Sequence, residues 1–399
     1  MRVKEIRNIS DINSIIENDT ENLFNLILDF KKNGKFDQNK AALLDYITDN
    51  FDKLENKVSC LNFFVPYERI PKKEFSCFLK FYQKIENKIP CYVDVNHEYH
   101  NDIQVLNAKK ENISQPNTYS DAHWDIKTII KANTEINRVC DFVKKQSFSP
   151  FETLAYIHNY VSTVANYNTS TPVYFHDARH DQFFAGAYDD IPEVVCAGYS
   201  SLMFEIIESL NLPNLKCQLV RLDVKNLEKN FIASHQKCLI KIKDDKYGLN
   251  QTVFDDPTFD NKEDAISSKY SHFAMPNDCH IESKNKLWQY NNIFICRSNE
   301  NKNVVQIQNF DKSKELYNNS ENQIDQKMIE TVYANIMHKC DENASSHDIY
   351  KALKVLAKES FRHQINKKYI GNLTKSDLIL TKKEIDQICD RKNEKTFVF

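Results

Sequence analysis

The stretch from Val195 to Ile207 reads VCAGYSSLMFEII, and the fold of the middle of the chain can be predicted outward from it. Apolar residues recur after Cys196 with the spacing of one helix face, so the stretch predicts a helix whose N-terminal edge is that cysteine. The apolar positions are Tyr199, Leu202, Met203, Ile206, Ile207 and Leu210.

A cysteine at this position is suited to nucleophilic chemistry. The first turn of a helix has unpaired N–H groups and the positive end of the helix dipole. Both lower the pKa of a thiol, and the same N–H groups stabilise an oxyanion on a carbonyl that the sulfur attacks. Gly198 removes a side chain where substrate would approach. Cys196 is therefore the predicted nucleophile, and the alternative is a buried structural cysteine that ends a loop.

A β-ribbon is predicted downstream of the helix. Strands are expected over residues 219–224 and 235–243, with an antiparallel return over residues 246–256. Asp244 and Asp245 form a candidate two-residue turn. That turn would place His235 at the start of its strand and opposite Phe254.

His235 is the candidate base for Cys196, and the alternative is a surface histidine at a strand end. Because side chains alternate along a strand, two polar residues of the return strand would share the face of His235. They are Asn250 and Asp256, whereas Asp255 would point away. Either could orient the imidazole, but only with a twist or a bulge, because neither lies directly opposite His235.

Residues 145–262 resemble the transglutaminase-like superfamily, whose core is papain-like. The resemblance rests on a helix over residues 150–165, then Cys196-Ala197-Gly198-Tyr199 at a helix start, then His235 on a strand about forty residues later. The resemblance implies an α+β fold in which a helix carrying the cysteine packs on an antiparallel sheet carrying the histidine and an Asn or Asp. It also implies that Gly198 and Tyr199 lie at the substrate-binding site.

The third catalytic residue departs from the family pattern. Asn250 lies fifteen residues after His235, where the family commonly has Asp, and spacing favours it. The run from Asp256 to Asp260, DPTFD, is the closer literal match to the family motif but comes six residues late. Asn250 is preferred, and Asp256 remains a rival.

The resemblance implies thiol-dependent acyl transfer or hydrolysis at an amide of a protein or peptide. Cys196 would attack the carboxamide carbon and His235 would shuttle the proton. Protease, deamidase and cross-linking outcomes all stay open, and no cofactor or calcium is implied. Because Asn250 replaces an Asp, a catalytically inactive interaction module is the second hypothesis.

Three regions are expected along the chain. Residues 1–115 form an N-terminal α/β region that could recognise a partner, residues 116–310 form the transglutaminase-like core, and residues 311–399 form a C-terminal helical region. In the first region, Ser10 is expected to cap a helix that ends at Gly34. In the core, Ser149 and Glu152 predict a capping box at the start of the helix over residues 150–165.

Composition excludes several classes of function. With 53 basic and 56 acidic residues, the net charge of −3 gives no general attraction to nucleic acid or to anionic membranes. None of the eleven cysteines forms a Cys-x-x-Cys pair, which argues against a zinc ribbon or a redox motif and for a reducing compartment. The N-terminus has no signal-peptide pattern and no apolar run is long enough to span a bilayer. We expect a cytoplasmic protein, with delivery into another cell as the alternative and the oligomeric state left open.

Two short histidine-containing stretches raise the question of a metal site. The spacing of His176 and His180, each followed by an aspartate, would suit a metal on one helix face, but the residues before them do not favour a helix. A solvated substrate loop is the preferred interpretation. Cys279 and His280 lack neighbouring ligands in the sequence, so no metal is predicted.

Overall fold

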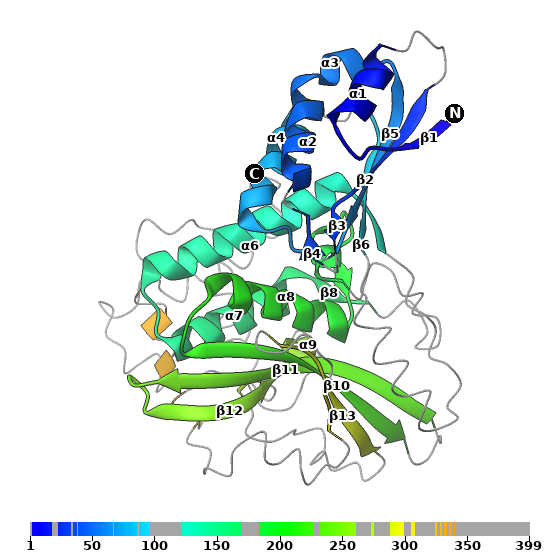
Figure 1. The fold of residues 1–399 in the computed structure, drawn as a ribbon. Coiled ribbons are helices and arrows are strands. Elements are labelled where there is room, and N and C mark those ends of the chain that lie inside the picture. Colours follow the sequence, from blue (N-terminus) through cyan, green and yellow to red (C-terminus); the bar gives the residue numbers. More distant parts are fainter. Residues whose placement is uncertain are drawn as a thin grey trace. The chain divides into compact units, whose positions relative to one another are not determined.

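The protein is a mixed α+β molecule in the computed structural model (Figure 1). The structure describes residues 2–17, 23–32, 35–37, 39–66, 68–85, 88–95, 122–168, 183–226, 231–260, 273–274, 288–298 and 305–307, together with residues 324, 328, 331, 332, 335, 336 and 339.

The chain divides into two compact units with boundaries that differ from the predicted ones. Unit 1 comprises Met1–Glu135 and Asn168–Val194, and unit 2 comprises Ile136–Tyr167 and Val195–Phe399. A break near residue 115 was expected from the polar composition there. Instead the division falls inside α6 (Ile126–Gln146), a helix of 21 residues that the sequence analysis did not identify. The predicted region 311–399 lies almost wholly outside the described residues.

Unit 1 is built on a five-stranded sheet in the order β1-β2-β5-β6-β7. The first four strands run parallel and the last is antiparallel. The strands are β1 (Arg2–Glu5), β2 (Phe24–Asp29), β5 (Val58–Val65), β6 (Cys91–Val95) and β7 (Ala122–Asp125), and β3 (Lys31–Lys32) pairs with β4 (Lys35–Phe36). The helical elements are α1 (Ile9–Ile16), α2 (Asn39–Asp49), α3 (Phe51–Leu54), α4 (Lys72–Ile85) and the 3-10 turn η1 (Phe184–Tyr188).

The expected helix from Ser10 to Gly34 is wrong in extent and in its cap. The helix begins after Asn8, whose side chain accepts from the Asp11 N–H, and it ends at Ile16. Phe24–Asp29 is instead a strand in which buried and half-buried residues alternate. Pairing with β1 on one side and β5 on the other favours the strand, a long-range effect that local periodicity does not contain.

Unit 2 is built on an antiparallel sheet in the order β12-β11-β10-β13-β14. The strands are β10 (Leu215–Asn226), β11 (Phe231–Asp244), β12 (Leu249–Asp255), β13 (Trp288–Ser298) and β14 (Val305–Ile307). Helix α8 (Cys196–Leu210) packs on β10 and β11, and α7 (Pro150–Val164) packs on α8 and β11 (Figure 1). The short elements are β8 (Asn166–Tyr167), in unit 2, β9 (Glu193–Val194), in unit 1, and α9 (Pro257–Asp260), which follows β12.

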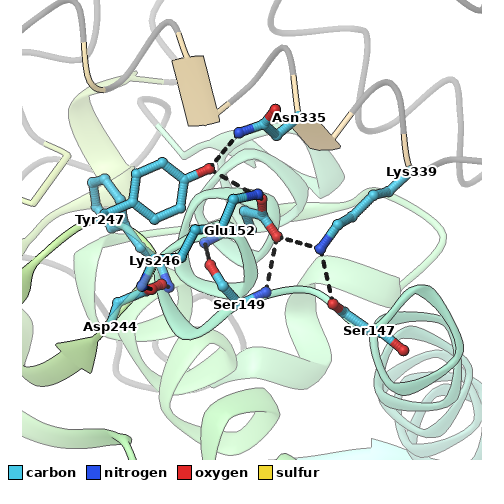
Figure 2. A network of polar contacts seen from close by, with 9 residues as sticks. Ser147, Ser149, Glu152, Asp244, Lys246, Tyr247, Asn335 and Lys339 are labelled. Atoms are coloured by element: carbon cyan, nitrogen blue, oxygen red, sulfur yellow. Dashed lines mark hydrogen bonds and ion pairs between the residues drawn. The ribbon is translucent and has the colours of Figure 1, made fainter.

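The predicted capping box of α7 is confirmed. The Ser149 side chain accepts from the Glu152 N–H, and the Glu152 carboxylate accepts from the Ser149 N–H. The same carboxylate binds Lys246 at 2.5 Å, Lys339 at 2.8 Å and the Tyr247 hydroxyl at 3.0 Å (Figure 2). The start of α7 is thereby joined to the turn after β11.

The ribbon closes later than predicted. Asp244 pairs with Leu249, so four residues form the turn instead of the expected two. Gly248 takes a φ of 65°, a left-handed conformation in which residues with a Cβ atom are strained. The longer turn shifts the register, and Phe254 lies opposite Leu239 rather than His235.

Within the described residues, no helix combines the length and apolar character needed to cross a membrane.

Candidate functional site

Cys196 is the first residue of α8, as the apolar stripe predicted. Val195 is the N-cap, and because its side chain is apolar it makes no capping hydrogen bond to the first-turn N–H groups beside Cys196. The helix residues from Gly198 to Ile207 are buried, whereas Cys196 is half-buried. The fold thus fixes the helix and leaves its first two residues less buried than those that follow.

His235 lies on β11 and contacts both other members of the site. Its Nε2 atom lies 2.6 Å from Oδ2 of Asp256. The imidazole is also hydrogen-bonded to the thiol of Cys196. With Nε2 held by the carboxylate, Nδ1 is the ring nitrogen left to exchange a proton with the sulfur. The side chain is 16% exposed, so it is largely shielded from water.

Asp256 is held at both carboxylate oxygens. It follows β12 directly, its side chain is fully buried, and Oδ1 accepts the Thr258 N–H at 3.3 Å. That bond anchors the carboxylate to the first turn of α9, while Oδ2 faces His235. The structure therefore brings Cys196, His235 and Asp256 together.

The prediction that Asn250 orients the imidazole is wrong. Asn250 is exposed and pairs with Lys243, near the turn and far along β11 from His235. The physical reason is the longer turn. Each added turn residue moves the return strand along its partner, so a residue six positions later reaches the histidine.

The charges in this group reinforce one another. Burial alone would raise the pKa of the Cys196 thiol, but the His235 charge, its hydrogen bond and the Gln236 backbone N–H lower it overall. Burial likewise disfavours the charged imidazole, yet the Asp256 carboxylate and the Cys196 thiolate raise the pKa of His235 to about 10. The arrangement favours a thiolate–imidazolium pair.

The thiol pKa of four other cysteines is shifted in the opposite direction. Burial raises the pKa of the thiols of Cys77, Cys91, Cys217 and Cys238. Reaction with an electrophile requires the thiolate, so these groups are expected to be inert by comparison.

Tyr199 was expected at the substrate-binding site, and the structure places it in the interior. Its side chain is fully buried and its hydroxyl donates to the Ala165 carbonyl at 2.8 Å, which ties α8 to the end of α7. Gly198 is buried within α8 as well. Gly198 and Tyr199 therefore lie in the interior rather than on an open surface.

A second histidine–aspartate pair lies next to the first, and the sequence analysis missed it. His158 of α7 places Nδ1 2.7 Å from Oδ1 of Asp255, and both side chains are almost fully buried. The other oxygen of Asp255 accepts the Ala274 N–H. The available signal in the sequence was the pair of consecutive aspartates. Their side chains face opposite sides of a strand, and Asp255 was expected to point away from His235.

The described residues contain no group of three or more His, Cys, Asp or Glu side chains able to hold a metal ion. The segments around His176 and His280 lie outside the described residues.

Searches of protein-family models, of curated proteins and of solved structures found no match to this chain.

Proposed function

We propose that the protein is a cysteine hydrolase or acyltransferase that acts at an amide of a protein or peptide. The observation that carries the proposal is the contiguous group of Cys196, His235 and Asp256, in which a lowered thiol pKa accompanies a raised imidazole pKa. A buried carboxylate, an imidazole and a thiol at a helix start are the parts that nucleophilic acyl transfer requires.

We further propose that unit 2 is a transglutaminase-like, papain-related core. Helix α8 bears the cysteine and packs on the antiparallel strands that bear the histidine and lead into the aspartate. This order of elements supports the resemblance drawn from the Cys-x-Gly-Tyr motif.

The reaction would run in two halves. The Cys196 thiolate attacks the carbonyl carbon, and N–H groups at the start of α8 stabilise the oxyanion. The amine leaves with the proton of the His235 imidazolium, and a thioester remains on the sulfur. His235 then accepts a proton from water or from an amine that attacks the thioester, and the thiolate is restored. Water gives hydrolysis or deamidation, and an amine gives cross-linking.

Asp256 weakens the case for a catalytically inactive module. That hypothesis was motivated by an asparagine as the third residue. A buried carboxylate at 2.6 Å from His235 supplies the negative charge that the asparagine would lack.

The test is selective alkylation of the full chain with iodoacetamide at about pH 6, with each modified cysteine located by mass spectrometry. Cys196 is expected to react at least ~10-fold faster than buried Cys217 and Cys238, since only a thiolate reacts. His235→Ala should remove the difference, and Lys243→Ala, at the other end of β11, should preserve it. Equally slow alkylation of all three cysteines in the native protein would refute the proposal.

A further inference from the structure

We propose that Gln236 and Ser200 form a positioning pair that sets the placement of His235 against Cys196. The inference rests on the proposed function and deepens it, because it identifies what keeps the nucleophile and its base in register. Neither residue touches the reacting atoms with its side chain, so both are positioning residues.

The pair joins the two elements that carry the chemistry. Gln236 follows His235 on β11, and Ser200 lies one turn after Cys196 on α8. The Gln236 amide Nε2 donates to the Ser200 hydroxyl oxygen at 3.0 Å. The two groups are 5% and 0% exposed, so water does not compete for this bond.

The bond continues to the nucleophile itself. The Ser200 hydroxyl donates to the Cys196 carbonyl oxygen at 2.8 Å. A hydroxyl has one proton and accepts through its lone pairs, so accepting from Gln236 and donating to Cys196 are compatible. A continuous path therefore runs from the residue after His235 to the backbone of Cys196.

Two further contacts connect β11 with α8. The backbone N–H of Gln236 donates to the Cys196 sulfur and contributes to lowering the pKa of its thiol. Two residues along β11, the Cys238 thiol donates to the Ser200 carbonyl at 3.4 Å. Gln236 thus contacts α8 through its side chain and the nucleophile through its backbone.

Directionality explains why polar groups occupy this buried interface. Apolar side chains of equal volume would fill the space but would tolerate small slides of the strand along the helix. A hydrogen bond between buried groups fails when its partners separate, and leaving either group unsatisfied is costly. A displacement of about 1 Å between reacting groups can cost roughly 100-fold in rate.

Two substitutions remove the bond from opposite ends. Gln236→Met keeps the length of the side chain without the amide, and Ser200→Ala removes one oxygen. The matched control is Ser201→Ala, the next residue of α8, whose side chain is 8% exposed. The readouts are the pH midpoint of Cys196 alkylation by iodoacetamide and the midpoint of thermal unfolding, with the double variant Gln236→Met/Ser200→Ala included.

Both single variants are expected to raise the alkylation midpoint of Cys196 and to slow its reaction at about pH 6 by roughly 10- to 100-fold. The double variant should be no slower than the slower single variant, because one bond is lost in each case. Ser201→Ala should leave the midpoint unchanged.

An unchanged midpoint in folded variants, or an equal change in Ser201→Ala, would overturn the inference. Loss of the fold in both single variants would also overturn it, since the bond would then serve stability. A native Cys196 with the midpoint of an ordinary thiol would refute the proposed function instead, so the two failures are distinguishable.

Discussion

At the scale of single residues, two neighbouring carboxylates have different partners because the backbone directs them to opposite sides. Asp255 points to His158 of α7, and Asp256 points to His235 of β11. Both are fully buried, and each lies within hydrogen-bond distance of its own imidazole. Burying a carboxylate without such a partner would be strongly unfavourable.

Replacing Asp256 with Asn should show whether Asp256 or Asn250 orients His235. The substitution removes the charge that raises the pKa of His235, so that pKa should fall from about 10 and the Cys196 thiolate should lose stabilisation. We expect alkylation of Cys196 at about pH 6 to slow by at least ~10-fold. Asn250→Ala is the control and should match the native rate, whereas a slow Asn250→Ala with a normal Asp256→Asn would reverse the assignment.

The pH dependence of Cys196-dependent activity should be bell-shaped. The active pair needs an ionised thiol and a protonated imidazole. Activity therefore rises as pH passes the lowered pKa of Cys196 and falls as pH passes the raised pKa of His235, about 10. Peptide-amide turnover measured between about pH 4 and pH 11 checks this, and an alkaline limb near pH 6.5 would contradict it.

At the scale of elements, the start of α7 is fixed by one carboxylate. Burial opposes ionisation of Glu152, but bonds from Lys246, Lys339 and the Ser149 N–H outweigh it and lower its pKa to about 2. The segment that contains Lys339 also buries Val332 and Ile336, and its Asn335 donates to the Tyr247 hydroxyl (Figure 2). The start of α7, the turn after β11 and the segment that contains Lys339 are therefore linked through the Glu152 carboxylate.

Glu152→Gln should destabilise the protein by roughly 1–3 kcal/mol near neutral pH, because two lysines lose their buried partner. The folded pKa lies below the ordinary value of 4.5, so the stabilisation is complete above pH 4.5 and is lost as pH falls through about 2. Urea unfolding measures the difference in unfolding free energy between Glu152→Gln and the native protein, and this difference should be smaller at about pH 3 than at neutral pH. The control is Asp245→Asn, which changes an exposed acid in the nearby turn. A difference that is larger in acid would contradict the expected pH dependence.

At the scale of the whole molecule, each unit is assembled from separate stretches of chain. Unit 1 takes up residues 168–194 after the chain has begun unit 2. Within unit 1, Glu68 accepts the Ala185 N–H at 2.9 Å, and Trp124 packs edge-on against Phe183. These contacts join residues far apart in the sequence, so neither unit corresponds to a continuous segment.

A chain shortened to residues 116–399, the boundary expected from composition, should therefore fold poorly. It lacks four of the five strands of the unit 1 sheet and leaves Phe183 and Phe184, both almost fully buried, without their core. We expect increased binding of the dye ANS and a lower unfolding midpoint than for the full chain. Native-like dye binding by the shortened chain would show that the two stretches of unit 1 are independent.

Elements with a strong local signal were predicted well from the sequence. The capping box of α7 and the start of α8 at Cys196 both depend on residues within one or two turns, and both are confirmed. Backbone hydrogen bonding at a helix start is a local property, so sequence alone determined it.

The third member of the site was decided only by the tertiary structure. Local rules left Asn250 and Asp256 open, and spacing favoured the wrong one. The choice depends on how many residues form the turn after Asp244, and a single added pair of turn residues shifts the whole return strand. Likewise, strand Phe24–Asp29 exists because it pairs with β1 and β5. The sequence determined which candidate residues are available, and long-range pairing decided which of them meet.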